Sequence, residues 1–124
     1  AMGRFRHEAI AIDPITNIAY QTEDRDDGLI YRFIPKKSSR YGLKGKLQAL
    51  KISEKDTRNW KFNSIIKNQS YPVEWINLDN PDRDDDSLRY DGQKNGASIF
   101  ARPEGMWFDK DSIYFTCTSL VRYI

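Results

Sequence analysis

The chain has 124 residues, of which 39% are hydrophobic and 31% are charged, as in a soluble globular protein of at most one domain or in part of a larger one. Its 20 basic and 18 acidic residues leave a net charge of +2, which excludes a broad electrostatic attraction to nucleic acid or to a membrane, and neither is expected as a partner. No apolar run approaches the roughly 20 residues needed to cross a bilayer, and a single cysteine excludes an internal disulfide framework.

Runs of β-forming residues fill the first 52 positions. EAIAID and NIAYQTED are separated by a proline and asparagine turn at residues 14–17, and RDDG at 25–28 supplies the next turn. LIYRFIP is an aromatic and β-branched run that ends at Pro35, and GKLQALKI alternates polar and apolar residues after Gly45. Because short connections favour antiparallel neighbours, residues 7–52 are expected to form one four-stranded antiparallel meander.

The segment 53–101 is expected to be an insertion that contains the main helix. One or two helical turns are predicted in EKDTRNW, after a capping pattern that begins at Ser53, and SIIKN and VEWINLD are candidate short strands. DNPDRDDD is a loop too acidic to bury itself. The main helix is predicted over 86–101, because the acidic residues 84–86 favour the positive end of a helix dipole.

One face of that helix is expected to pack closely. Each glycine in a helix costs about 1 kcal/mol relative to alanine, so the two glycines of this segment predict a close approach of the helix to its neighbours. The residues expected to share the packed face are Leu88, Gly92, Gly96, Ile99 and Phe100.

The stretch ARPEGMWFDKDSIYFTCTS repeats the pattern of FRHEAIAIDPITNIAYQTED near the start of the chain. Aligning the two places Glu8 on Glu104, and IAYQT on IYFTC after turns that differ in length by one residue. The first unit, residues 7–52, has about the length of a propeller blade, ~40–50 residues, and residues 102–124 would start another. The expected fold is therefore mainly β, a partial β-propeller with one complete four-stranded antiparallel blade, a helical insertion and part of the next blade.

The repeated glutamates are the first candidates for a functional site. In a propeller the first strand of each blade lines the central channel, so Glu8 and Glu104 are expected to converge. A glutamate at the start of one strand is usually a solvated or capping residue, but two facing carboxylates must share a proton, bind cations or meet an arginine. Arg102 is such an arginine, and if metal bound the carboxylates it would be free to hold an anion through its planar guanidinium.

Several motifs together resemble the PhoX-type alkaline phosphatases of bacteria. They are GRFRHEA, TEDRDDGLIYRFIP, GKLQAL, WINLDNPD and FARPEGMWFD followed by IYFTCTS, and they occur in the family's order from Gly3 to Ser119. The resemblance implies a six-bladed β-propeller that binds calcium and iron and hydrolyses phosphate monoesters, of which this chain is a central fragment. It also implies a periplasmic or secreted protein, usually exported by the twin-arginine route, although these residues contain no export signal pattern.

The resemblance assigns roles to individual residues. Glu8 of RHEA and Glu104 of RPEG would be metal ligands, and Arg102 of the same RPEG would be a phosphate clamp. Glu23 and Asp24 of TEDR are weaker candidates for metal ligands, and they are equally consistent with an acidic pair that closes a turn. The family's iron-bound cysteine is expected in an earlier blade.

The remaining residues of interest favour packing roles. Cys117 lies in a predicted strand and is expected to be a small buried side chain. His7 is the only histidine, so neither a two-histidine metal site nor a hydrolase triad is expected in these residues. His7 is expected to support a ligand or to pack.

The sequence is therefore compatible with three alternative functions. The first is a fragment of a metal-dependent phosphate-monoester hydrolase, and the second is a noncatalytic propeller remnant or binding module. The third is a calcium-dependent propeller lactonase or ester hydrolase, since such propellers also place a glutamate before an apolar inner strand. About one and a half blades cannot close a ring, so the chain by itself is expected to be inactive, to bind metal weakly or not at all, and to self-associate through open strand edges.

Overall fold

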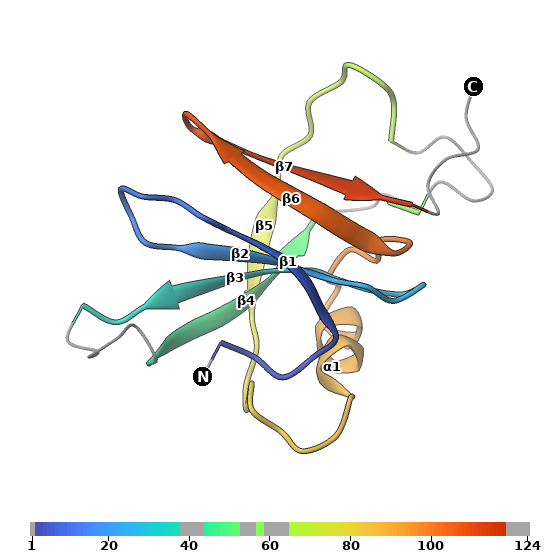
Figure 1. The fold of residues 1–124 in the computed structure, drawn as a ribbon. Coiled ribbons are helices and arrows are strands. Elements are labelled where there is room, and N and C mark those ends of the chain that lie inside the picture. The colour runs from blue at the N-terminus through green and yellow to red at the C-terminus, as the bar shows by residue number, and fades with distance from the viewer. Residues whose placement is uncertain (1, 38–43, 53–56, 59–64, 119–124) are drawn as a thin grey trace.

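The computed structural model describes residues 2–37, 44–52, 57–58 and 65–118 (Figure 1). Within these ranges a five-stranded sheet has the order β1-β2-β3-β4-β5, and a separate two-stranded sheet contains β6 and β7. Every neighbouring pair of strands is antiparallel. The strands are β1 His7–Ile12, β2 Ala19–Glu23, β3 Ile30–Pro35, β4 Gly45–Lys51, β5 Glu74–Asn77, β6 Pro103–Asp109 and β7 Ser112–Cys117.

The predicted meander over residues 7–52 is confirmed, but the sheet is larger than four strands. The predicted strand in VEWINLD forms as β5 and pairs with β4, with Ala49 opposite Ile76 and Leu50 opposite Trp75. Pairing between strands so far apart in the chain depends on tertiary contacts, which a local pattern does not contain. The predicted strand SIIKN is not formed in its described part, residues 65–68, where Asn68 has a φ of 62° that an extended strand does not adopt.

The helix is much shorter than predicted. Helix α1 spans Leu88–Lys94 rather than residues 86–101, because Gly96 follows it with a φ of 90° and the backbone then leaves the helical path. Beyond that turn the chain bonds to β4 and to the β2–β3 loop: the amide of Ser98 donates to the Leu50 carbonyl, and that of Phe100 donates to the Gly28 carbonyl. Ile99 and Phe100 therefore do not share a helical face with Leu88.

Strand β3 is buried on both of its faces. Ile30 and Tyr31 are neighbours in the chain and point to opposite sides of the sheet, and both are at most 2% exposed. Tyr31 belongs to a core that includes Leu88 of α1, whereas Ile30 belongs to a core that includes Cys117 of β7. The five-stranded sheet is therefore covered by the helical segment on one side and contacted by the β6–β7 hairpin on the other (Figure 1).

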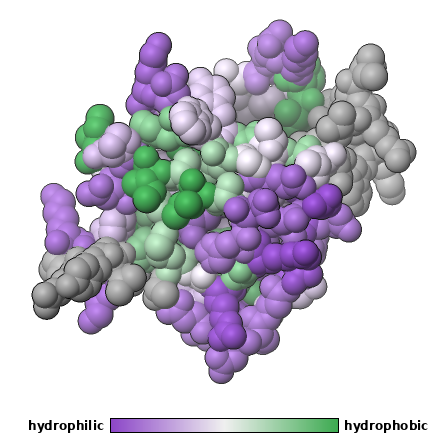
Figure 2. Space-filling view, in the orientation of Figure 1, coloured by the Kyte–Doolittle hydropathy of each residue, from purple (hydrophilic) through white to green (hydrophobic). Residues whose placement is uncertain are grey.

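Two further observations concern the outer surface. No helix in the described part of the chain is long and apolar enough to span a membrane. Figure 2 shows hydrophobic surface over β1, the strand on which Ile10 and Ile12 are 51% and 53% exposed.

The predicted helical turns in EKDTRNW lie outside the described residues, apart from Thr57 and Arg58.

Gly92 provides a test of the close helix packing. A Cβ atom on Gly92 would lie 2.5 Å from Cδ1 of the fully buried Leu29, so Gly92→Ala must shift packed atoms. We expect a loss of about 1 kcal/mol in the free energy of unfolding, because overpacking costs about 1–3 kcal/mol and the higher helix propensity of alanine returns about 1 kcal/mol. Urea unfolding of the variant and the wild type measures the difference.

Gly105→Ala is the matched control. A Cβ atom on Gly105 would meet only Oγ1 of Thr116, at 3.4 Å, so this change should stay within about 0.5 kcal/mol of the wild type. A Gly92→Ala protein as stable as the wild type would contradict the packing explanation.

Candidate functional site

The two candidate metal ligands occupy equivalent β-bulges. The β1–β2 register shifts between His7 and Ile10, and the β6–β7 register shifts in the same way between Pro103 and Met106. Each bulge places two residues opposite one, and Glu8 and Glu104 are the first residues of the two bulges. Bulges are common beside functional sites because they change the direction of a side chain.

The repeat is therefore present in three dimensions, with one correction to its alignment. The pairs His7–Glu23 and Pro103–Cys117 are equivalent, as are Ile10–Gln21 and Met106–Phe115. These pairs place residues 19–23, rather than 18–22, on residues 113–117. The connections differ by two residues, not one, because the amide of Asp13 bonds to the Ile18 carbonyl across four residues, whereas Asp109 pairs with Ser112 across two.

The corrected alignment changes which side chains correspond. A shift of one residue moves a side chain to the opposite face of a strand. Thr22 now corresponds to Thr116, and Glu23 corresponds to Cys117.

Arg102 is held in place by both its backbone and its side chain. It has a φ of 54°, a left-handed conformation that is uncommon for a residue other than glycine. Its amide donates to the Arg25 carbonyl at 2.8 Å, and its carbonyl accepts from the amide of Thr118 at 3.1 Å. These bonds fix the conformation at the entrance to β6, two residues before Glu104.

The guanidinium of Arg102 joins two acids. Nε lies 2.9 Å from Oδ1 of Asp24 and Nη2 lies 3.1 Å from Oδ2, while Nη2 also lies 2.9 Å from Oε1 of Glu104. The hydroxyl of Thr118 donates to the same Glu104 oxygen at 2.9 Å. The hydrogen bond from Arg102 lowers the pKa of Asp24 below its ordinary value. In this structure the arginine therefore compensates the charges of Asp24 and Glu104.

Glu8 has a different environment from Glu104. Its side chain is exposed and lines an open pocket with His7 and Gln21. Among the described residues no hydrogen bond or ion pair engages Glu8, so it is not linked to the Arg102 group. The structure thus brings together Arg102, Asp24 and Glu104, and places Glu8 on the equivalent bulge of the neighbouring hairpin.

Glu23 is enclosed on the helix side of the sheet. Its Oε1 accepts hydrogen bonds from the Leu29 amide at 3.3 Å and the Tyr31 hydroxyl at 3.1 Å, whereas its buried Oε2 has no partner in the described structure. Burial raises the pKa of Glu23 to about 7, although the positive charge of Arg89 opposes the shift. This carboxyl is therefore protonated in a much larger share of molecules at neutral pH than an exposed glutamate would be.

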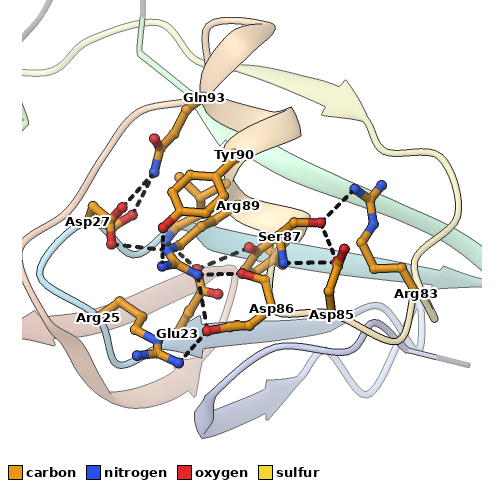
Figure 3. A network of polar contacts seen from close by, with 12 residues as sticks. Glu23, Arg25, Asp27, Arg83, Asp85, Asp86, Ser87, Arg89, Tyr90 and Gln93 are labelled. Carbon is orange, nitrogen blue, oxygen red and sulfur yellow. Dashed lines mark hydrogen bonds and ion pairs between the residues drawn. The ribbon is translucent and has the colours of Figure 1, made fainter.

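A charged network next to Glu23 joins the β2–β3 loop to α1 (Figure 3). Nε of Arg89 lies 3.0 Å from Oδ1 of Asp27, and Nη1 of Arg89 lies 3.3 Å from Oδ2 of Asp86. Arg25 pairs with the same Asp86 oxygen. Because the carbonyl of Arg25 accepts the amide of Arg102, this network supports the loop that holds Arg102. A sequence pattern of mixed charges gave no signal of it.

The donor atoms present suit calcium better than iron. Calcium prefers six to eight oxygen ligands, and Glu8 and Glu104 supply carboxylate oxygens but only part of such a set. Cys117 does not fit an iron site, since it packs among apolar residues and burial raises the pKa of its thiol to about 12. The expectation that Cys117 is a buried packing residue is confirmed. The described residues contain no group of three or more His, Cys, Asp and Glu side chains arranged to hold a metal.

Comparison with known proteins gives one match. Residues 1–122 match the family model described as alkaline phosphatase PhoX, which covers nearly the whole chain. No curated protein and no solved structure matches the chain.

The pKa of Glu23 leads to a prediction about pH. Between its ordinary value of 4.5 and about 7, the folded protein retains a proton that the unfolded chain has released, so the stability of the wild type falls as pH rises through this window. Glu23→Gln imitates the protonated acid and removes this dependence. We expect the variant to gain stability relative to the wild type as pH rises, by up to about 3 kcal/mol above pH 7.

Urea unfolding of both proteins between pH 5 and pH 8, about the range over which Glu23 changes its charge, measures this difference. The other acids are present in both proteins, so their contributions to the pH dependence of stability cancel when the two curves are subtracted. Two parallel stability curves would show that Glu23 keeps the same proton affinity in the folded and unfolded chain.

Proposed function

Because this chain belongs to the alkaline phosphatase PhoX family, we propose that it supplies part of the active site of a metal-dependent phosphate-monoester hydrolase. The observation that carries this proposal is the pair of equivalent bulges at Glu8 and Glu104, with Arg102 fixed beside the second one. Carboxylates at corresponding bulges and an arginine two residues away supply the two kinds of group that phosphate chemistry requires, namely metal ligands and an anion-binding cation.

Glu8 and Glu104 are assigned to metal binding. In the intact protein the resemblance implies calcium and iron, and when bound such metals would neutralise phosphate charge and make an oxygen nucleophile available near neutral pH. Because the Glu8 carboxylate is exposed, it can bind a cation without first breaking a contact with another side chain of the described residues. Glu104 would exchange its contact with Arg102 for the metal. Glu23 and Asp24 stay weaker predictions as ligands, because Tyr31 and Arg102 respectively already engage them.

Arg102 is assigned to the phosphate. Asp24 and Glu104 engage its Nε and Nη2, whereas no hydrogen bond is made to its Nη1 within the described residues. An arginine anchored on one edge by Asp24 keeps donors for two phosphate oxygens without losing its orientation. In phosphoryl transfer such a cation stabilises the charge on the equatorial oxygens of the transferred group.

We place the chain as a central segment of a larger six-bladed propeller in the periplasm or outside the cell. Residues 7–52 with β5 would form one blade, β6 and β7 would begin the next, and the segment with α1 would be an insertion. The repeated bulges support this arrangement, as do exposed apolar side chains on the two sheets, including Ile12 at 53% and Trp107 at 71%. Such side chains would be covered by further blades, and the chain alone would be inactive.

Substitutions in the intact protein test the assignments. We expect Glu8→Gln and Glu104→Gln to release bound metal, and Arg102→Ala to retain it, while each lowers kcat/KM for a phosphate monoester by about 100-fold or more. Arg4→Ala is the control, since the ion pair of Arg4 with Asp84 lies on the surface and contributes little. Near-normal hydrolysis by all three site variants would refute the assignment.

Elemental analysis of the intact protein separates the proposal from the other functions. Calcium together with iron is the expected result for the phosphatase. Calcium alone with ester or lactone hydrolysis would indicate a propeller lactonase, and a protein without either metal would indicate a noncatalytic or binding module.

Self-association gives a further prediction for the isolated chain. We expect light scattering during gel filtration to show species larger than the 14.5 kDa monomer, because open strand edges and the apolar residues of β1 invite contact with a second copy. Ile12→Lys should shift the chain toward the monomer. Ile15→Lys, in the β1–β2 turn, removes an equally apolar exposed residue and should not. A monomeric wild-type chain with metal-dependent phosphatase activity would contradict the incomplete propeller.

A further inference from the structure

The hydroxyl of Thr22 bridges the two bulges. Thr22 lies on β2 and its side chain is fully buried. Its Oγ1 accepts a hydrogen bond from the amide of Ala9 at 2.9 Å and donates one to the carbonyl of Glu104 at 2.7 Å. One side-chain atom therefore joins the bulge of β1 to the bulge of β6.

One of these bonds is made beside a candidate ligand, and the other is made by a candidate ligand itself. Ala9 directly follows Glu8 in the first bulge, and Glu104 is the first residue of the second bulge. These two strands belong to different sheets, and no ladder pair joins β1 to β6. The distance between the backbones that carry the two carboxylates therefore depends on this contact more than on strand pairing.

We propose that Thr22 is a positioning residue that sets the spacing of Glu8 and Glu104 for a shared divalent cation, an inference that rests on the proposed function. A cation accepts its oxygen ligands only within about 0.2 Å of the preferred distance, so the backbones of two ligands must be held in register. Thr22 acts through Ala9 and Glu104 and does not itself contact the metal.

The second hairpin contains its own comparison. Thr116 occupies the position equivalent to Thr22, opposite the bulge of β6, but its side chain is exposed and its Oγ1 lies 3.5 Å from the Gly105 carbonyl. A threonine opposite such a bulge is thus not obliged to bridge to another strand. The role of Thr22 comes from its burial between the two hairpins, not from the bulge alone.

Loss of the Thr22 hydroxyl would remove a hydrogen bond from two part-buried backbone groups. The Ala9 amide and the Glu104 carbonyl would each lose the hydrogen bond that Thr22 makes, which favours a local separation of the two strands. Arg102 and Thr118 would still hold the Glu104 carboxylate, so the hairpin would stay folded with altered spacing. Mutation of a residue that orients metal ligands in this way typically lowers the metal affinity by about 10–100-fold.

Three variants of the intact protein, in which the remaining ligands are present, test the proposal by calcium titration and amide hydrogen exchange. Thr22→Val keeps the side-chain volume but removes the hydroxyl, and we expect calcium binding about tenfold weaker with faster hydrogen exchange of the Ala9 amide. Thr22→Ser keeps the hydroxyl and should retain wild-type affinity. Thr116→Val removes the corresponding hydroxyl of the other hairpin and should also retain it.

Glu8→Gln and Glu104→Gln separate this inference from the proposed function. If both variants bind calcium like the wild type, or if the wild type binds none into the millimolar range, the metal role fails and the positioning role fails with it. If they lose calcium but Thr22→Val binds as tightly as the wild type, only the positioning role is overturned.

If the Thr22→Val protein does not fold, the wild type is measured instead. There, calcium should slow the exchange of the Ala9 amide, because a cation held by both bulges stabilises the bridge between them. Unchanged exchange at saturating calcium would overturn the proposal.

Discussion

Strand β3 must be buried on both faces, and the rest of the structure is arranged to meet this requirement. Ile30 and Tyr31 alternate across the sheet, and leaving either exposed would cost about 1.5–3 kcal/mol. The side of Tyr31 is covered by residues of α1 and the segment after it. The side of Ile30 receives Cys117 and Phe100, which brings the β6–β7 hairpin against the sheet. The approach of the second hairpin to β1 and β2 follows from this packing.

The candidate site forms where that hairpin meets the β2–β3 loop. Asp24 and the carbonyl of Arg25 come from the loop and hold Arg102 at the start of β6. The loop is in turn tied to α1 through Arg89, whose buried guanidinium is paired with Asp27 and therefore does not remain an uncompensated charge. The helical segment thus contributes to the position of Arg102 without contacting it, since its charges fix the loop that does.

Glu23 and Asp24 show how neighbouring acids of one motif acquire opposite properties. Glu23 is the last residue of β2 and is enclosed against Tyr31, so burial raises its pKa. Asp24 lies just beyond the strand and meets Arg102, which lowers its pKa. Desolvation dominates the first carboxyl and a charged hydrogen-bond donor dominates the second. The TEDR motif indicates neither the burial of Glu23 nor the contact of Asp24 with the distant Arg102. The sequence therefore predicted the same role for both acids.

The sequence alone determined the β-strands of residues 7–52, the terminal hairpin, the likeness of Glu8 and Glu104, and the family motifs, because strand alternation, turn residues and motif spacing are local properties. Only the tertiary structure decided the addition of β5, the early end of α1 at Gly96, and the two-residue difference between the hairpin turns. It also decided that Thr22 bridges the bulges while Thr116 does not. These features depend on which segments meet across the core. Equivalent residues of the repeat acquire different partners because Thr22 is enclosed between the two hairpins, whereas Thr116 is exposed.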